Sequence, residues 1–451
     1  MIGHQSQGTS SIRMAIERWF AIGLEAVDPY NATRSALRRV DGGIDVDGKI
    51  VPLASDATVV GLAIGKAAAP MARALQDALG DRLDHRVLIT KDGHLGGAPA
   101  GWQLFEASHP VPDARGVLAT SAALQALAGL TDKDLVIVLV SGGGSAIFEA
   151  PIEPLELDHI RQVTDLLLRA GAPIQDLNAV RSELSQVKGG GLRRQIGPAT
   201  CISLILSDVL GNDPTVIASG PTISRSPDPA RALAILESYG LLERIHPAVK
   251  EVLQTRKASS LAGVTSSRDR FVIVGDNQIL VHTVAAAARK DGFSASIELE
   301  DAEGEASTLA SEFLAVASEQ PESVDVVVGG GEATVKVTGD GIGGRNTEFA
   351  LAAAQELAES SRDWVVASLA SDGQDGANQA AGAIVDRWTT QRGDLVGLSA
   401  MQALRANDSG TYLGELDELV VTGPTGTNVN DVYIAVRNTD RTRTILGEGT
   451  Q

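Results

Sequence analysis

Short apolar runs rich in β-branched residues recur along the whole chain, and each is followed by glycines or acids and then by a helical pattern. The clearest runs are TVVGLAIG (58–65), RVLIT (86–90), LVIVLV (135–140), TCISLIL (200–206), RFVIVG (270–275), VDVVV (324–328) and DWVVASLA (363–370). Continuous apolar strands that alternate with helices are typical of a mostly parallel sheet covered on both faces. The sequence therefore predicts an α/β fold, in which ligands bind at the carboxyl ends of the strands.

The length of the chain, 451 residues, is too great for one ordinary hydrophobic core. The most polar stretch between predicted strands is QTRKASSLAGVTSSRDR (254–270), a little past the middle. We therefore expect two α/β domains, 1–257 and 258–451, of which the N-terminal one is the larger.

The net charge of −19 and the sequence pI of about 4.8 exclude nucleic acid and anionic membranes as expected partners, because both would repel such a surface. A small anionic substrate stays compatible, since a local cluster of cations acts within a Debye length of roughly 8 Å. The only cysteine, Cys201, excludes a disulfide within the chain. Together with the lack of a recognisable signal peptide or membrane span, this predicts a cytoplasmic protein.

Glycine-rich loops and isolated polar groups follow the predicted strands. Lys66 follows the first strand, SGGGSA (141–146) the third and Asp208 the fourth. The loops GGGEAT (329–334), SDGQDG (371–376) and TGPTGTNVND (422–431) come later. Bare backbone N–H groups and hydroxyls suit phosphate or carboxylate oxygens, although one such loop alone could be a plain tight turn. Lys66 does not belong to a P-loop, because GLAIGKA lacks the required spacing and the hydroxyl residue.

A literal G-x-G-x-x-G match at Gly339, Gly341 and Gly344 precedes a strong helical pattern. It favours a nicotinamide-dependent reductase of hydroxypyruvate or tartronate semialdehyde, and this stays an alternative function. We discount it because Arg345 opens the helix where a pyrophosphate site relies on bare backbone. An arginine there indicates a fork for phosphate or carboxylate oxygens, or a simple ion pair with Glu348.

The carboxylates Asp208 and Asp372 are the predicted ligands of Mg²⁺, which takes one or two carboxylates together with phosphate oxygens. The sequence contains no cluster of cysteine and histidine residues, so we do not expect a zinc site. His109, in ASHPVPD (107–113), is interpreted as a structural residue.

The series GKA, SHPVPD, SGGGSA, NAVR…LSQVKGG, LSDVLGNDPTVIASGPT, GGGEATVKVTGDGIGGRN, SDGQDG and TGPTGTNVND closely resembles the glycerate 2-kinases with a C-terminal MOFRL domain. The resemblance covers nearly the whole chain and keeps the order of the motifs. It implies two α/β domains, the larger one Rossmann-like, with the active site in the cleft between them. It also implies transfer of the γ-phosphoryl group of ATP to the 2-hydroxyl of D-glycerate, with Mg²⁺.

The resemblance and the strand-end positions together predict the site. Lys66, Arg345 and Asp208 are the expected catalytic residues, and Asp208 and Asp372 the expected metal ligands. Substrate or nucleotide contacts are expected at Ser141, Gly142, Gly143, Gly144, Ser145, Lys188, Gly331, Glu332, Asn346, Thr427 and Asn428. Which glycine loop binds the nucleotide stays open, and so does the oligomeric state, with a homodimer as one alternative.

The chain departs from the usual pattern of the family at Ala333, Thr347 and Ser371. Ala333 and Thr347 replace polar groups of the family pattern that could touch the substrate, so a related sugar acid is an alternative acceptor. A non-catalytic binding module for small sugar acids is the third functional alternative.

Overall fold

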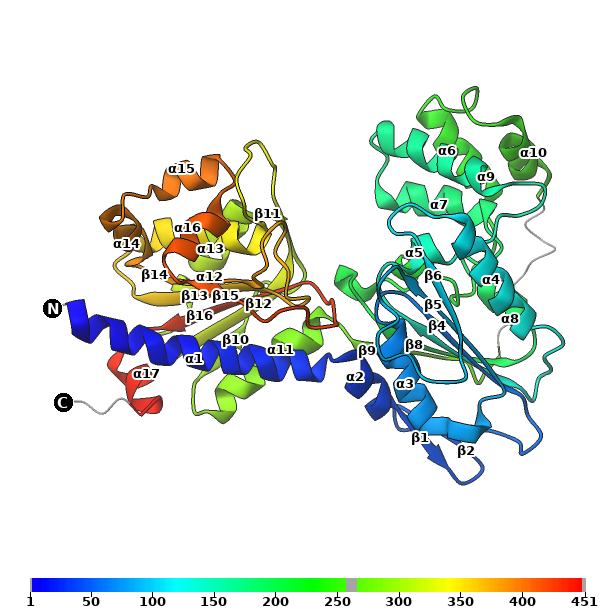
Figure 1. Cartoon of the computed structure of the whole chain (residues 1–451), viewed down its shortest axis with the longest axis horizontal. Helices are drawn as coiled ribbons and strands as arrows, with labels where there is room; N and C mark the ends of the chain where they lie inside the picture. The colour runs from blue at the N-terminus through cyan, green and yellow to red at the C-terminus, as the bar shows by residue number, and fades with distance from the viewer. Residues whose placement is uncertain (1, 257–265, 448–451) are drawn as a thin grey trace. The chain divides into compact units, whose positions relative to one another are not determined.

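The structure of the protein is a computed structural model that describes residues 2–256 and 266–447. The chain divides into two compact units, which we name the N-terminal unit (Pro29–Val274) and the C-terminal unit (Met1–Asp28 with Gly275–Gln451). The expected boundary between residues 257 and 258 falls where the described residues are interrupted. Helix α1 (Ile2–Ala26) belongs to the C-terminal unit because it packs along α11 (Asn277–Lys290) (Figure 1).

The main sheet of the N-terminal unit has six strands in the order β6-β5-β4-β7-β8-β9. The pairings β4–β5, β5–β6, β4–β7 and β7–β8 are all parallel, which confirms the predicted parallel sheet. Its strands are β4 (Val59–Ile64), β5 (His85–Lys91), β6 (Gln103–Ala107), β7 (Leu135–Val140), β8 (Thr200–Leu206) and β9 (Arg270–Gly275). A small antiparallel sheet joins β1 (Leu37–Val40), β2 (Gly43–Val46) and β3 (Lys49–Pro52).

Helices cover both faces of this parallel sheet. Val60, Leu62 and Ile64 of β4 pack in one core with residues of α4 and α8, whereas Gly61 faces Leu75 of α3 on the other side. A separate apolar core joins α6, α7, α9 and α10. The helices of the N-terminal unit are α2 (Pro29–Ala36), α3 (Ala68–Leu79), α4 (Ala114–Ala126), α5 (Gly144–Ile147), α6 (Leu157–Arg169), α7 (Ile174–Leu184), α8 (Gly191–Ile196), α9 (Pro229–Ser238) and α10 (Pro247–Thr255).

The sheet of the C-terminal unit is mixed, unlike the parallel sheet of the N-terminal unit. Its order is β10-β12-β16-β13-β14-β15, with β11 paired to β12. The strand β16, near the end of the chain, inserts antiparallel between β12 and β13. The strands are β10 (Ala295–Ile297), β11 (Ala302–Glu305), β12 (Val326–Thr334), β13 (Trp364–Ala370), β14 (Gly382–Asp386), β15 (Leu419–Val420) and β16 (Asp431–Arg437).

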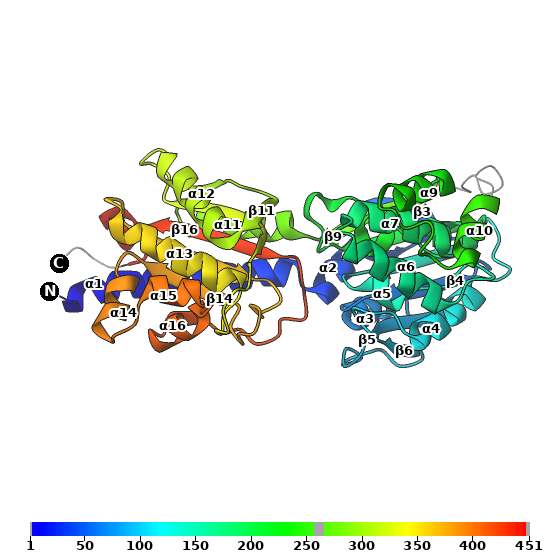
Figure 2. The same cartoon turned by 90° about the horizontal axis from the view of Figure 1, so that it is seen from above.

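Helices lie on both faces of the mixed sheet as well. Helices α1, α11 and α17 gather on one face, and α12 to α16 on the other (Figures 1 and 2). The further helices of this unit are α12 (Ala306–Glu319), α13 (Arg345–Glu359), α14 (Thr389–Leu395), α15 (Ala400–Arg405), α16 (Ser409–Glu415) and α17 (Asp440–Ile445). None of the helices in the described part of the chain is long and apolar enough to cross a membrane.

Candidate active site

The parallel sheet of the N-terminal unit reverses its strand order between β4 and β7, because β5 and β6 lie on one side and β8 and β9 on the other. In such sheets, ligands bind outside the carboxyl ends of the strands at this point of reversal. Lys66 follows β4 and the SGGGSA segment follows β7. The chain therefore brings its first two predicted site segments together at the position that the fold favours for a ligand.

Direct contacts hold these two segments against each other. The backbone N–H of Lys66 donates to the carbonyl of Gly142 at 2.9 Å, and that of Ala67 donates to Ser141 Oγ at 3.0 Å. Gly65 has φ +120°, and a Cβ there would lie 2.3 Å from Ser141 Oγ. The buried Ser141 hydroxyl thus fixes the backbone on which Lys66 is carried.

The three glycines of SGGGSA leave room for protein groups of the site. A Cβ on Gly142 would lie 2.1 Å from Asp208 Oδ2, and one on Gly143 would lie 3.2 Å from Lys66 Cγ. Gly143 also has φ +83°, a left-handed conformation that strains other residues. The glycines therefore let Lys66 and Asp208, which the sequence predicted to be catalytic, approach the same short segment.

Two titratable groups beside this glycine segment have shifted pKa values. Burial raises the pKa of Asp208, and the charge of Lys66 opposes this shift. Burial, and then the charge of Lys66, lowers the pKa of His109, which favours the neutral form of its ring. His109 Cδ2 would lie 3.3 Å from a Cβ on Gly143. A residue interpreted as structural from the sequence thus lies at the glycine segment.

A chain of polar contacts continues from the glycine segment to residues that the sequence analysis missed. Ser145 Oγ lies 2.8 Å from Ser219 Oγ, and the Ser219 hydroxyl donates to Asn178 Oδ1 at 3.2 Å. Ala218 and Ser219 both have left-handed φ values, 49° and 63°. Such strain in non-glycine residues concentrates at functional sites. The motif ASGPT (218–222) was the available signal, but sequence separation hid its proximity to Ser145.

Lys188, another predicted binding residue, makes its contacts with groups of the protein that follow the glycine segment. It is fully buried, its Nζ donates to the Phe148 carbonyl at 2.8 Å, and it pairs with Glu149 Oε2 at 3.2 Å. Burial lowers its pKa to about 8, against the charge of Glu149. The neighbouring Arg181 donates from Nη2 to the Ser145 carbonyl at 2.9 Å. Lys188 is therefore arranged to support residues 145–149, and a direct ligand contact for it stays a prediction.

In the C-terminal unit, Arg345 opens α13 and Asp431 opens β16. Asp431 stands beside Ala370, the last residue of β13, because β16 runs antiparallel to β13. Arg345 binds this carboxylate through two contacts, Nε to Oδ2 at 2.6 Å and Nη2 to Oδ1 at 2.9 Å. The ion pair with Glu348 considered from the sequence is not formed, since Glu348 accepts from Asn407 instead.

Burial and charge act in opposite directions on this ion pair. Burial raises the pKa of the fully buried Asp431 to about 6, although Arg345 and Asn346 lower it. Burial lowers the pKa of Arg345, but the Asp431 carboxylate outweighs burial and raises it above its usual value. The charge of Glu332 raises it further. The arginine therefore stays charged beside a carboxylate that is difficult to solvate.

The start of α13 is fixed by Asp375, which the site prediction did not include. Its carboxylate accepts the backbone N–H of Asn346 at 2.8 Å and of Thr347 at 2.7 Å, and also the Thr347 hydroxyl at 2.7 Å. Asn346 donates from Nδ2 to Asp431 at 3.0 Å. These buried contacts fix the backbone directly after Arg345. Asn346 also binds Asp431, the carboxylate that orients the Arg345 guanidinium.

The segment GGGEAT (329–334) is not a loop, which corrects the sequence-based expectation. It continues strand β12. A Cβ on Gly330 would lie 2.2 Å from Asn277 Oδ1, and a Cβ on Gly331 would lie 2.0 Å from the Ala302 carbonyl. The glycines are needed because neighbouring groups pack directly onto the strand. Gly331 lies within this packed strand, whereas Glu332 is exposed at its end.

The G-x-G-x-x-G segment also packs against protein. A Cβ on Gly339 would lie 2.3 Å from the Ala406 carbonyl. A Cβ on Gly341 would lie 2.4 Å from Asp408 Cβ, and one on Gly344 would lie 2.3 Å from the Asp375 carbonyl. The segment is separated from β12 by residues 335–338, so it is not the tight turn of a dinucleotide site. The space beside the glycines whose spacing favoured a reductase is therefore filled by other residues of the protein.

The positions at which the chain departs from the family pattern are buried. Ala333 is 2% exposed in the apolar core, and Thr347 is 0% exposed and bound to Asp375 and Ser409. The expectation that these two positions could touch the acceptor is therefore wrong. Ser371 is buried too, and its Oγ accepts the Val429 N–H at 2.8 Å.

The remaining predicted residues of the C-terminal unit serve nearby loops. Asp372 accepts the N–H of Gln374 at 2.9 Å, Thr427 donates to the Val27 carbonyl at 2.8 Å, and Asn428 accepts the N–H of Asn430 at 3.2 Å. Asp208 and Asp372 belong to different units, so their joint role as metal ligands stays a prediction. The described residues contain no group of three or more metal-ligating side chains.

Comparison with known proteins identifies both halves of the chain. Residues 15–254 match the model of a domain of unknown function, DUF4147, and residues 325–431 match the MOFRL family. A D-glycerate 2-kinase of Thermotoga maritima is 38% identical over 385 residues, which are 84% of this chain and 90% of that protein. A protein of Agrobacterium vitis, named provisionally as a hydroxypyruvate reductase, is 38% identical over 82% of this chain and 84% of its own.

The fold agrees with these sequence matches. The crystal structure of a glycerate kinase from Thermotoga maritima superimposes with a TM-score of 0.84 and 34% identity, covering 95% of this chain and 100% of that one. The matches span nearly the whole length of this chain, as the ordered series of motifs does. The chain therefore belongs to the DUF4147/MOFRL family of glycerate 2-kinases.

Proposed function

We propose that this protein transfers the γ-phosphoryl group of ATP to the 2-hydroxyl of D-glycerate, which gives 2-phosphoglycerate and ADP. One observation carries the proposal beyond the family match. Lys66, Asp208 and a run of three glycines meet where the parallel sheet reverses its strand order. A cation, a carboxylate and bare backbone at this position are what phosphoryl transfer requires.

The transition state of phosphoryl transfer spreads negative charge over the equatorial oxygens, so the protein mainly positions and neutralises. We assign the neutralising charge to Lys66, whose backbone is held by Gly142 and whose side chain passes Gly143. Ser141 to Ser145 would hold an anionic oxygen of a substrate. The buried, positively charged group of Arg181, Glu149 and Lys188 beneath this segment favours such an anion electrostatically.

Asp208 is our choice for the residue that orients the acceptor hydroxyl or binds Mg²⁺. Its burial and its place beside Gly142 and Lys66 fit either role, because Mg²⁺ needs only one or two protein carboxylates when phosphate oxygens complete its shell. When bound, Mg²⁺ would neutralise charge on the phosphate oxygens. Asp372 is the second proposed ligand.

Arg345 is the second cation in the proposal, and Asp431 keeps its guanidinium oriented. We propose that Lys66 and Arg345 serve one reaction and that Asn346 supports Arg345 through its bond to Asp431. Thr427, Asn428, Gly331 and Glu332 remain proposed binding residues of the C-terminal unit.

The test is ADP release with ATP and Mg²⁺ and a panel of acids: D-glycerate, L-glycerate, hydroxypyruvate, threonate and erythronate. The product is identified by phosphorus NMR. We expect turnover of D-glycerate to the 2-phosphate, reduced by about 10²–10³-fold in Lys66→Ala and in Arg345→Ala. Lack of turnover with every acid, in folded protein, would overturn the proposal. Turnover of another acid alone would keep the chemistry and change the substrate.

A further inference from the structure

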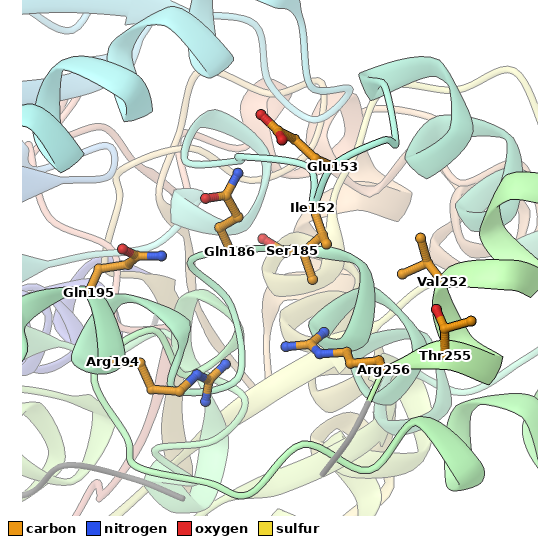
Figure 3. Close-up of a pocket in the computed structure, with 9 residues that line it drawn as sticks. All are labelled: Ile152, Glu153, Ser185, Gln186, Arg194, Gln195, Val252, Thr255 and Arg256. Carbon is orange, nitrogen blue, oxygen red and sulfur yellow. The ribbon is translucent and has the colours of Figure 1, made fainter. Parts of the chain in front are cut away.

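A cavity of about 530 Å³ opens in the N-terminal unit beside α8 and the end of α10, and no residue predicted for the catalytic site lines it. Its polar lining comprises Ser185, Gln186, Arg194, Gln195, Thr255 and Arg256, with Glu153 at the margin. Figure 3 shows the guanidinium groups of Arg194 and Arg256 pointing toward one another across the cavity, while the Glu153 carboxylate points away from them.

The arginines at this cavity outnumber the carboxylates that could balance them. Arg194, Arg225 and Arg256 gather around one buried carboxylate, Glu183. Glu183 pairs with Arg225 Nη2 at 3.3 Å through Oε1, and with Arg256 Nη1 at 3.4 Å through Oε2. Arg194 has no carboxylate partner among the described residues, and its Nη1 donates to the carbonyls of Gly189 and Arg225 at 3.2 and 3.1 Å. Three cations thus share one carboxylate.

Both arginines that face the cavity keep donors without a protein partner. The hydrogen bonds and the ion pair of Arg194 and Arg256 all use Nη1, so Nε and Nη2 of each have no acceptor within the described ranges. Arg225 Nε is also buried without a partner. Burial, followed by the charge of Arg256, lowers the pKa of Arg194, and burial likewise lowers that of Arg256. An anion in the cavity would offset both burial and repulsion.

We propose that this cavity binds a small phosphorylated anion between Arg194 and Arg256. Two guanidinium groups match the charge of a phosphomonoester, which is about −1.5 to −2 at neutral pH, better than that of a single carboxylate. Planar guanidinium forks bind such oxygens through paired hydrogen bonds. The Gln195 amide adds donors on the same lining.

The glycines of VKGGG (187–191) support the same arrangement, and the proposed catalysis gives them no role. Gly189 and Gly190 have left-handed φ values of 54° and 78°. A Cβ on Gly190 would lie 2.4 Å from the Ile223 carbonyl and 3.3 Å from Arg194 Nη1. The glycines therefore allow Arg194 and the segment that carries Arg225 to approach closely.

The experiment is calorimetric titration of the full-length protein with inorganic phosphate, at constant ionic strength set by chloride. Four variants are compared with wild type: Arg194→Gln, Arg194→Gln/Arg256→Gln, Lys66→Ala and Arg244→Gln. Arg244 is exposed and lies outside the cavity, so it is the matched control for loss of one arginine. Lys66→Ala separates phosphate bound at the catalytic site from phosphate bound in the cavity.

We expect saturable binding of phosphate that persists in Lys66→Ala and Arg244→Gln. The affinity should fall about tenfold or more in Arg194→Gln and further in the double variant, because a hydrogen bond to a charged group contributes at least about that factor to binding. Loss of binding in Lys66→Ala with retention in Arg194→Gln would overturn the proposal, as would a wild type that binds no phosphate. If loss of Arg256 prevents folding, the comparison of Arg194→Gln with Arg244→Gln decides.

Discussion

Arg345 and Asp431 form a two-pronged ion pair across 86 residues of sequence, with contacts of 2.6 and 2.9 Å and with the carboxylate fully buried. The pair exists because β16 starts at the same edge of the sheet at which β13 ends. The arginine that the family resemblance predicts to be catalytic is thus oriented by a residue outside its own motif.

Asp431→Asn should therefore impair catalysis. Because the buried carboxylate both pairs with Arg345 and accepts from Asn346, its loss should lower kcat/KM by about 10²-fold, as does removal of other positioned electrostatic groups. Steady-state kinetics with ATP and D-glycerate check this. The control is Asp440→Asn, an exposed aspartate in the first turn of α17. A fully active Asp431→Asn protein would contradict the positioning role.

Asp375→Ala should destabilise the fold more than Asp372→Ala does. Asp375 accepts two backbone N–H groups and one hydroxyl in a buried environment, whereas the partly exposed Asp372 side chain accepts one backbone N–H. We expect a loss of about 2–3 kcal/mol for Asp375→Ala and less than about 1 kcal/mol for Asp372→Ala, measured by urea unfolding. Equal losses in both variants would show that Asp375 does not anchor α13.

Gly142→Ala should lower activity by displacing Asp208, the carboxylate proposed to take part in catalysis. The added Cβ would lie 2.1 Å from Asp208 Oδ2, so the Asp208 carboxylate must shift from its position. We expect kcat to fall by about 10²-fold, because small displacements of positioned groups have effects of this size. Gly96→Ala is the matched control, since a Cβ at this exposed glycine meets nothing within 4 Å. Normal kcat in Gly142→Ala would exclude this arrangement of Asp208.

The stability of the protein should rise with pH relative to a variant without the Lys188–Glu149 pair. Burial lowers the pKa of Lys188 to about 8 from 10.5, so between these values the unfolded chain holds a proton that the folded protein has released. The free energy of unfolding of wild type, minus that of Lys188→Met/Glu149→Gln, should increase between pH 8 and 10.5. The upper bound is about 3 kcal/mol, and urea unfolding across this range measures it. A flat or falling difference would contradict a depressed pKa for Lys188.

NADH should not bind. The glycines of the G-x-G-x-x-G segment are in contact with residues 375 and 406–408, which leaves no bare backbone for a pyrophosphate. The fluorescence of NADH should stay unchanged on titration with the protein, with or without hydroxypyruvate. A saturable change in that fluorescence would reopen the reductase alternative.

The local sequence predicted some of the strands, because a continuous apolar run is typical of a strand that is buried on both faces. β4, β5, β7, β8, β9, β12 and β13 all lie where these runs occur. The same reasoning located Lys66, the SGGGSA segment and Asp208, since parallel strands carry their ligand groups at their carboxyl ends. The structure brings these three together as expected.

In the C-terminal unit, strand direction and long-range partners were decided only by the tertiary structure. β16 pairs antiparallel with β12 and β13, and that alone places Asp431 beside Arg345. The glycines of β12 and of residues 339–344 look like ligand loops in the sequence, yet they are filled by neighbouring backbone. A run of glycines indicates only that another group approaches the backbone closely at that position. Whether this is a ligand or the protein itself depends on packing between distant segments, which local sequence does not encode.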